Sequence, residues 1–225
     1  MQSEPGPETN DELHLVARVW IPDRPGALGL VASRIGAVGA DIVGIDVLER
    51  SPTIAIDEFA ILLPRGDLET LLVREIEQVD GATVEECREV REFPDARTDA
   101  LMSAERLCAA PDRAALLHVL ADDLRAEFAA DWTAVLRSGR LVARSGTSVP
   151  DESTLVTLDA HITDLSTVSA GFAGLDDLVA APIPGVDSLL IASRPGHPFR
   201  VRELRQMLAL ARITDLVAAR LRDSS

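Results

Sequence analysis

Two aspartates and a proline-glycine turn are the residues in this sequence whose types and spacing best suit the binding of a small charged molecule. Pro25 and Gly26 suit a turn that leads into a helix, because proline fixes a helical φ and glycine lets backbone amides lie close to a bound group. A helix that begins there points its N-terminal amides at the turn, where they favour an anion such as a carboxylate. Asp23 opens this turn and Asp41 opens the next predicted strand, so two carboxylates are available to accept hydrogen bonds from an ammonium group.

The predicted ligand site combines these charges. We expect the carboxylates of Asp23 and Asp41 to hold the ammonium group of a ligand and the amides of residues 26–28 to receive its carboxylate. The site residues are Asp23, Arg24, Pro25, Gly26, Ala27, Leu28, Asp41 and Ile42. A plainer interpretation stays open, because Asp-Arg-Pro-Gly is good turn chemistry without any ligand and Asp41 can be an ordinary residue at the start of a strand.

Residues for metal binding or catalysis do not form comparable patterns. The four histidines are scattered, no two of them are spaced i, i+4, and the two cysteines share no metal-like spacing with them. The sequence contains no Gly-x-Ser-x-Gly elbow, no glycine-rich phosphate loop and no dinucleotide fingerprint. We therefore expect no catalytic residues, no metal and no cofactor. The alternative is an enzyme whose site lies in the second half, where Asp159 and His161 lie near Ser166 and Ser169.

The elements around the turn alternate between strand and helix patterns. Residues 13–21 alternate as a strand, and five apolar residues then recur at helical spacing before Gly39. Two strands follow at 41–50 and 54–63, in which Asp57 shares the parity of the core residues Phe59, Ile61 and Leu63. A helix begins after Asp67, and 82–93 forms a last strand. The order βαββαβ is that of the ferredoxin-like sandwich.

The first half resembles a known regulatory module. A strand, then Asp-Arg-Pro-Gly-Ala-Leu, a short helix and Gly-Ala-Asp-Ile, over residues 13–93, is similar to the ACT domain, a small amino-acid-sensing module. In that family effectors bind between the loop after the first strand and the start of the second strand, and the two polar positions match Asp23 and Asp41. The family often has Asn before Arg-Pro-Gly, whereas this chain has a carboxylate.

A different arrangement follows a predicted linker at 94–98. Helices are expected before Pro111 and after Asp112, then strands at 132–137 and 141–145, at 178–183 and at 188–192. Residues 155–160 can be a strand or the start of a helix, and 162–172 favours a helix. The last helix, 201–221, has two apolar stripes, which fit either deep burial or a dimer seam. Residues 99–225 resemble a GAF-like, PAS-related domain, so the fold class is α+β in both halves.

Composition limits the partners. The 225 residues carry a net charge of −15, which argues against nucleic acids and anionic membranes, since both require a basic surface. All 22 basic residues are arginine, so lysine chemistry is excluded. Residues 1–12 carry no apolar core and predict a disordered tail rather than an export signal. No run approaches the roughly 18 apolar residues of a membrane helix, and we expect a cytoplasmic protein with reduced cysteines.

The sequence therefore predicts a cytoplasmic regulatory protein without catalysis. We expect it to sense a small molecule, an amino acid, and to act through ligand-dependent assembly or partner binding. A homodimer is expected, because the face of the first strand that carries Val16 and Trp20 and the last helix both need cover. The rival to this function is a dimerisation module whose ligand loop is degenerate.

Overall fold

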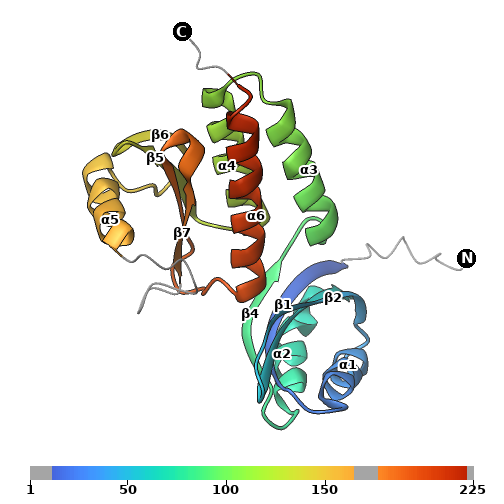
Figure 1. The fold of residues 1–225 in the computed structure, drawn as a ribbon. Coiled ribbons are helices and arrows are strands. Elements are labelled where there is room, and N and C mark those ends of the chain that lie inside the picture. The colour runs from blue at the N-terminus through green and yellow to red at the C-terminus, as the bar shows by residue number, and fades with distance from the viewer. Residues whose placement is uncertain (1–11, 165–176, 222–225) are drawn as a thin grey trace, which may run out of the picture. The chain divides into compact units, whose positions relative to one another are not determined.

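A computed structural model describes residues 12–164 and 177–221, and Figure 1 shows their helices and strands. Contacts divide the chain into two compact units, Met1–Pro94 and Asp95–Ser225. Each unit is described by itself. Residues 1–11 of the predicted tail lie outside the described ranges.

The N-terminal unit confirms the predicted α+β class and the βαββαβ order. Its elements are β1 (Leu13–Pro22), α1 (Ala27–Ala37), β2 (Asp41–Arg50), β3 (Ile54–Leu63), the 3-10 turn η1 (Gly66–Leu68), α2 (Glu69–Glu77) and β4 (Thr83–Glu89). The strands form one sheet in the order β2-β3-β1-β4, and every pair in it is antiparallel. In this order β2 and β4 are the edge strands, and β1 lies between β3 and β4.

One face of this sheet packs against α1 and α2 and forms the core. β1 contributes Leu15, Ala17, Val19 and Ile21 to it, and β3 contributes Phe59, Ile61 and Leu63. The two helices add four fully buried residues, Val31, Ile35, Leu72 and Ile76. Alternate residues of each strand point to the same face, and the apolar residues of α1 recur at helical spacing. The predicted apolar residues of β1, β3 and α1 therefore meet in one core between the sheet and the helices. Val16 lies on the other face of β1, which was predicted to need cover, and it is buried at 2% exposure.

The C-terminal unit is a second α+β unit. Its elements are α3 (Ala96–Ala109), α4 (Arg113–Glu127), β5 (Trp132–Arg137), β6 (Arg140–Gly146), α5 (Glu152–Asp164), β7 (Leu178–Ile183), the 3-10 turn η2 (Pro184–Val186), β8 (Ser188–Ser193) and α6 (Val201–Ala218). The antiparallel sheet has the order β6-β5-β8-β7. The helix expected after Asp112 is α4, and Asp112 caps it, because its Oδ1 accepts the N–H of Ala115 at 2.9 Å.

Both faces of the second sheet are apolar. One core joins this sheet to α3, α4 and α6, which lie side by side in Figure 1, and a smaller cluster joins its other face to α5. Both predicted stripes of α6 contact the first core: Met207, Leu210 and Ala211 are buried in it, and Leu204 and Leu208 pack against it. Burial inside the unit therefore accounts for the two stripes. None of the helices among the described residues is long and apolar enough to cross a membrane.

Two assignments of secondary structure differ from the prediction. Residues 96–98 were assigned to the linker but form the first turn of α3, because Asp95 caps that helix by accepting the N–H groups of Arg97 and Thr98. The ambiguous segment 155–160 belongs to α5. Of the helix predicted at 162–172, residues 165–172 lie outside the described ranges.

Candidate functional site

The turn between β1 and α1 is held by backbone hydrogen bonds and by one left-handed glycine. The N–H of Asp23 donates to the carbonyl of Thr53 at 2.9 Å, and the N–H of Arg24 donates to Pro22 at 2.8 Å. Gly26 has a φ of +86°, which a residue with a Cβ rarely adopts. These contacts place the end of β1 beside the start of β3 and direct the chain into α1.

The N-terminus of α1 has no side-chain cap. Gly26 occupies the capping position without a side chain, and the first turn contains no acidic residue. Among the first amides, the N–H of Ala27 donates to the carbonyl of Arg24 at 3.2 Å, and that of Leu30 donates to Gly26. An uncapped helix start carries partial positive charge, so this turn favours an anionic group.

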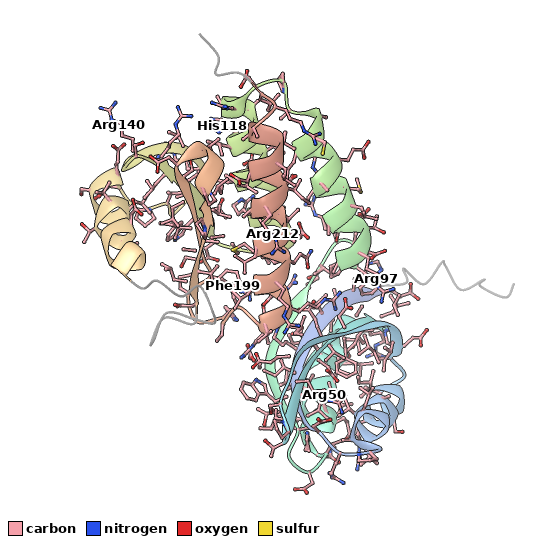
Figure 2. The ribbon with its side chains drawn as sticks, in the orientation of Figure 1. Arg50, Arg97, His118, Arg140, Phe199 and Arg212 are labelled. Carbon is pink, nitrogen blue, oxygen red and sulfur yellow. The ribbon has the colours of Figure 1, made fainter. Side chains whose placement is uncertain are left out.

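An ion pair lies at the same end of the sheet. Arg50, the last residue of β2, donates from Nε and Nη2 to the two carboxylate oxygens of Asp23, at 2.8 and 2.9 Å. The hydrogen bonds from Arg50 hold the pKa of Asp23 below its usual value. The Arg50 side chain is 71% exposed and that of Asp23 is 22% exposed, so the arginine is open to a ligand from solution. Figure 2 labels Arg50 on this unit.

A third charged residue, Asp57, lies beneath this pair on the helix-facing side of the sheet. It is two residues from Ala55, which pairs with Arg50, and it is only 4% exposed. Its Oδ1 is buried and has no hydrogen-bond partner among the described residues. Burial raises the pKa of Asp57, the charge of Asp23 raises it further, and the charge of Arg50 opposes both. A buried carboxylate oxygen without a donor costs free energy, so Oδ1 of Asp57 gains from any hydrogen-bond donor that reaches it.

Together these groups can bind a zwitterion. A carboxylate oxygen such as that of Asp57 can accept a hydrogen bond from an ammonium group, and a guanidinium group or the amides of a helix start can donate to a carboxylate. The Asp23–Arg50 pair alone has no net charge, and Asp57 makes the cluster negative. A ligand with an ammonium group is therefore favoured over a purely anionic one.

The structure does not bring the two predicted carboxylates together in one chain. Asp41 pairs with Leu62, which pairs with His14 at the beginning of β1, whereas Asp23 follows the end of β1. At about 3.3 Å per residue, the nine residues from His14 to Asp23 put the two carboxylates about 30 Å apart along the sheet. Within a single chain, the two carboxylates are therefore too far apart to hold one ammonium group. The reason is topological, because β1 and β2 run parallel and the end of one lies far from the start of the other.

The other predicted site residues divide between core and surface. Ala27 is buried in the core, and Ile42 packs against the same core. Arg24, Pro25, Gly26 and Leu28 are exposed around the turn.

Arg50 and Asp57 were not predicted as site residues. The sequence did contain an indication for Asp57, because this carboxylate lies on the same face of β3 as three core residues. Arg50 had none, because its approach to Asp23 follows from the strand order.

The remaining reactive residues do not form a site in the described part of the chain. No group of three or more His, Cys, Asp or Glu residues there could hold a metal ion. Burial raises the pKa of Cys87 to about 11, which disfavours its reactive thiolate. Asp159 lies on α5, while the side chain of His161 and residues Ser166 and Ser169 lie outside the described part.

Comparisons with known proteins give no family for the chain. No protein-family model matches the sequence, and no curated protein matches it. Solved structures resemble it at low identity. The solution NMR structure of the ACT domain from GTP pyrophosphokinase of Chlorobium tepidum is 15% identical, with a TM-score of 0.30, over 38% of this chain and 93% of that domain.

Two structures of bacteriophytochrome RpBphP3 from R. palustris also resemble the chain. One is 14% identical with a TM-score of 0.45, over 78% of this chain and 47% of that one. The other, its chromophore-binding domain, is 9% identical with a TM-score of 0.39, over 94% and 95% of the two chains. At these values the likenesses carry no argument about a ligand, an activity or a partner.

Proposed function

We propose that this chain is a regulatory protein without catalysis that senses a small molecule, an amino acid, through the turn between β1 and α1. The observation that carries the proposal is the buried Oδ1 of Asp57, which has no hydrogen-bond partner within residues 12–164 and 177–221 and lies in the electrostatic field of the Asp23–Arg50 pair. Asp57 receives the ligand's ammonium group, and Arg50 with the first amides of α1 receives its carboxylate. The resemblance of residues 13–93 to the ACT domain supports the same ligand class. The ligand acts through assembly or partner binding.

A thermal-shift measurement with the twenty amino acids tests this proposal. An amino acid that binds only the folded state stabilises it by about 2.7 kcal/mol at 100 times its Kd. For a chain of this size, about 2–4 °C per kcal/mol gives a rise in Tm of about 5–10 °C. Arg50→Ala is expected to lose most of this rise, because the ligand carboxylate loses its charged partner. N-acetylated amino acids, which lack the ammonium group, are expected to give smaller rises.

Arg65→Ala is the matched control. Arg65 is as exposed as Arg50 and also pairs with an aspartate, Asp67, but it follows the end of β3 at which Leu63 pairs with Leu13. That end is the far end of the sheet, so the variant should keep the full rise in Tm. A panel in which no amino acid raises Tm, or equal losses in both variants, would contradict the proposal. A blank panel from a stable dimer would favour the rival interaction module.

The proposed assembly is a homodimer. β2 is an edge strand, and Val43 near its start is 56% exposed, so the start of this edge is the proposed pairing surface. We expect light scattering at tens of micromolar to give the mass of two chains rather than 24.1 kDa. Val43→Lys should yield the monomer, because a lysine on an edge strand opposes pairing. Leu101→Lys, at a 73% exposed position on α3, should leave the mass unchanged.

Assembly also determines whether Asp41 belongs to the site. Asp23 and Asp41 can share a ligand only when they come from different chains. We propose that Asp41 and Ile42 contribute from the second copy, so Asp41→Ala should weaken binding in the dimer. A wild-type monomer at these concentrations would contradict the homodimer, and an unchanged affinity of the Asp41→Ala dimer would remove Asp41 from the site.

A further inference from the structure

Asp57 stands between two valines on the helix-facing side of the N-terminal sheet. It pairs with Val19 on β1 and with Val47 on β2. Val19 is fully buried, whereas Val47 is 51% exposed. Directly opposed residues of antiparallel strands bring their Cβ atoms to about 5 Å. Val47 therefore presents an accessible aliphatic side chain immediately beside the buried carboxylate.

The aliphatic surface continues from Val47 along β2. Ile45 pairs with the core residue Phe59, so it lies on the same face of the sheet as Val47, and it is 41% exposed. Leu28, in the first turn of α1, is 40% exposed. The surface next to Asp57 is thus apolar along β2, while the charges of Asp23 and Arg50 lie toward the turn.

We propose that the ligand is an α-amino acid with an uncharged aliphatic side chain, whose ammonium group binds Asp57 and whose side chain contacts Val47 and Ile45. This inference rests on the proposed function. The Cα atom of an amino acid carries both the ammonium group and the side chain. An ammonium group on Oδ1 of Asp57 consequently holds the side chain within reach of Val47, where apolar contact removes aliphatic surface from water.

Charge disfavours an acidic side chain on the ligand, and the loss of hydration disfavours a polar one. The cluster contains two carboxylates and one arginine, and the arginine is occupied by the ligand's α-carboxylate. An acidic side chain would face Asp57 and Asp23 without a cation to compensate them. A polar side chain would lose water against Val47 and Ile45, whose side chains offer no hydrogen bond in return.

Calorimetric titration of the full chain tests the assignment with four probes: L-leucine, L-valine, L-aspartate and 4-methylpentanoate, which is leucine without its amine. We expect the first two to bind and the last two to bind at least tenfold more weakly. Asp57→Asn should lower the affinity for leucine about tenfold or more, because it removes a charge-assisted hydrogen bond. Val47→Thr, which exchanges a methyl group for a hydroxyl, should lower it about fivefold.

Leu71→Thr is the control, because Leu71 is a comparably exposed aliphatic residue, at 43%, that lies on α2 rather than on β2. It should keep the wild-type affinity. Equal binding of leucine and aspartate, with no effect of Val47→Thr, would overturn the aliphatic assignment while the proposed function survives. Full affinity in Asp57→Asn, judged folded by its Tm, would overturn the role of Asp57. Binding of none of the twenty amino acids would overturn the proposed function itself.

Discussion

Replacing Gly146 by alanine is expected to destabilise the C-terminal unit by at least about 3 kcal/mol. Gly146, the last residue of β6, has a φ of +105°, and a Cβ built on it lies 2.3 Å from the carbonyl oxygen of Asp131 and 2.9 Å from the Cα of Trp132. Both neighbours are backbone atoms. The N–H of Asp131 is bonded to Ser193 on β8, so moving this backbone also disturbs the pairing of the sheet.

The measurement is urea unfolding followed by the fluorescence of Trp132. The chain has two tryptophans, and a Trp20→Phe background leaves Trp132, in β5 of the C-terminal unit, as the reporter. Gly139→Ala is the matched control, because Gly139 also has a positive φ, +71°, but a Cβ there meets nothing within 4 Å. That variant should cost about 1 kcal/mol. Equal costs for the two variants would show that the contact at Asp131 relaxes freely.

The N-terminal fold could be predicted because several local signals agree. Strand alternation in β1, the helical spacing of α1 and the left-handed Gly39 after α1 each indicate the same boundaries. The end of the unit was less predictable. Asp95 can be read as a linker residue or as a helix cap, and only its hydrogen bonds to Arg97 and Thr98 decide between them.

The candidate site could be predicted only where it is local in sequence. The turn from Asp23 to Gly26 and the helix start are contiguous, so spacing was sufficient to find them. The distance between Asp41 and Asp23 within one chain could not be predicted, because nearness in sequence to a turn does not tell at which end of the sheet a strand begins. Arg50 and Asp57 reach the turn through the pairing of β2 with β3, which no local pattern contains.

The consequence for function is a different charge balance from the one that sequence predicts. Two carboxylates alone would repel the carboxylate of an amino acid. Arg50 supplies the missing cation by pairing with Asp23, and Asp57 supplies the buried acceptor. Under the proposed function, each charged group of a zwitterion therefore has a partner: Asp57 for the ammonium group and Arg50 for the carboxylate.

Replacing Glu203 by alanine is expected to lower the free energy of unfolding of the C-terminal unit by about 3–5 kcal/mol. Glu203, in the first turn of α6, accepts two hydrogen bonds from Arg194, at 3.0 and 3.1 Å, and both side chains are at least nine-tenths buried. Arg194 also donates to the carbonyls of Phe128, His197 and Pro198 and lies 4.4 Å from the ring centroid of Phe199, which Figure 2 labels. Without Glu203 the guanidinium stays buried among neutral groups.

The same urea unfolding, followed by the fluorescence of Trp132, measures this loss of stability. Arg106→Ala is the control, because it shows how much stability is lost when an exposed ion pair is broken instead of a buried one. Arg106 pairs with Asp123 at 2.9 Å in the same unit, but its side chain is 46% exposed. Solvent screens that pair, so its loss should cost only about 0–1 kcal/mol. Glu203→Gln, which keeps an acceptor for Arg194 and for the N–H of Arg200, should fall between the two. If Glu203→Ala cost no more than Arg106→Ala, the buried pair would contribute no more than a surface one, and the apolar core alone would hold α6 to the end of β8.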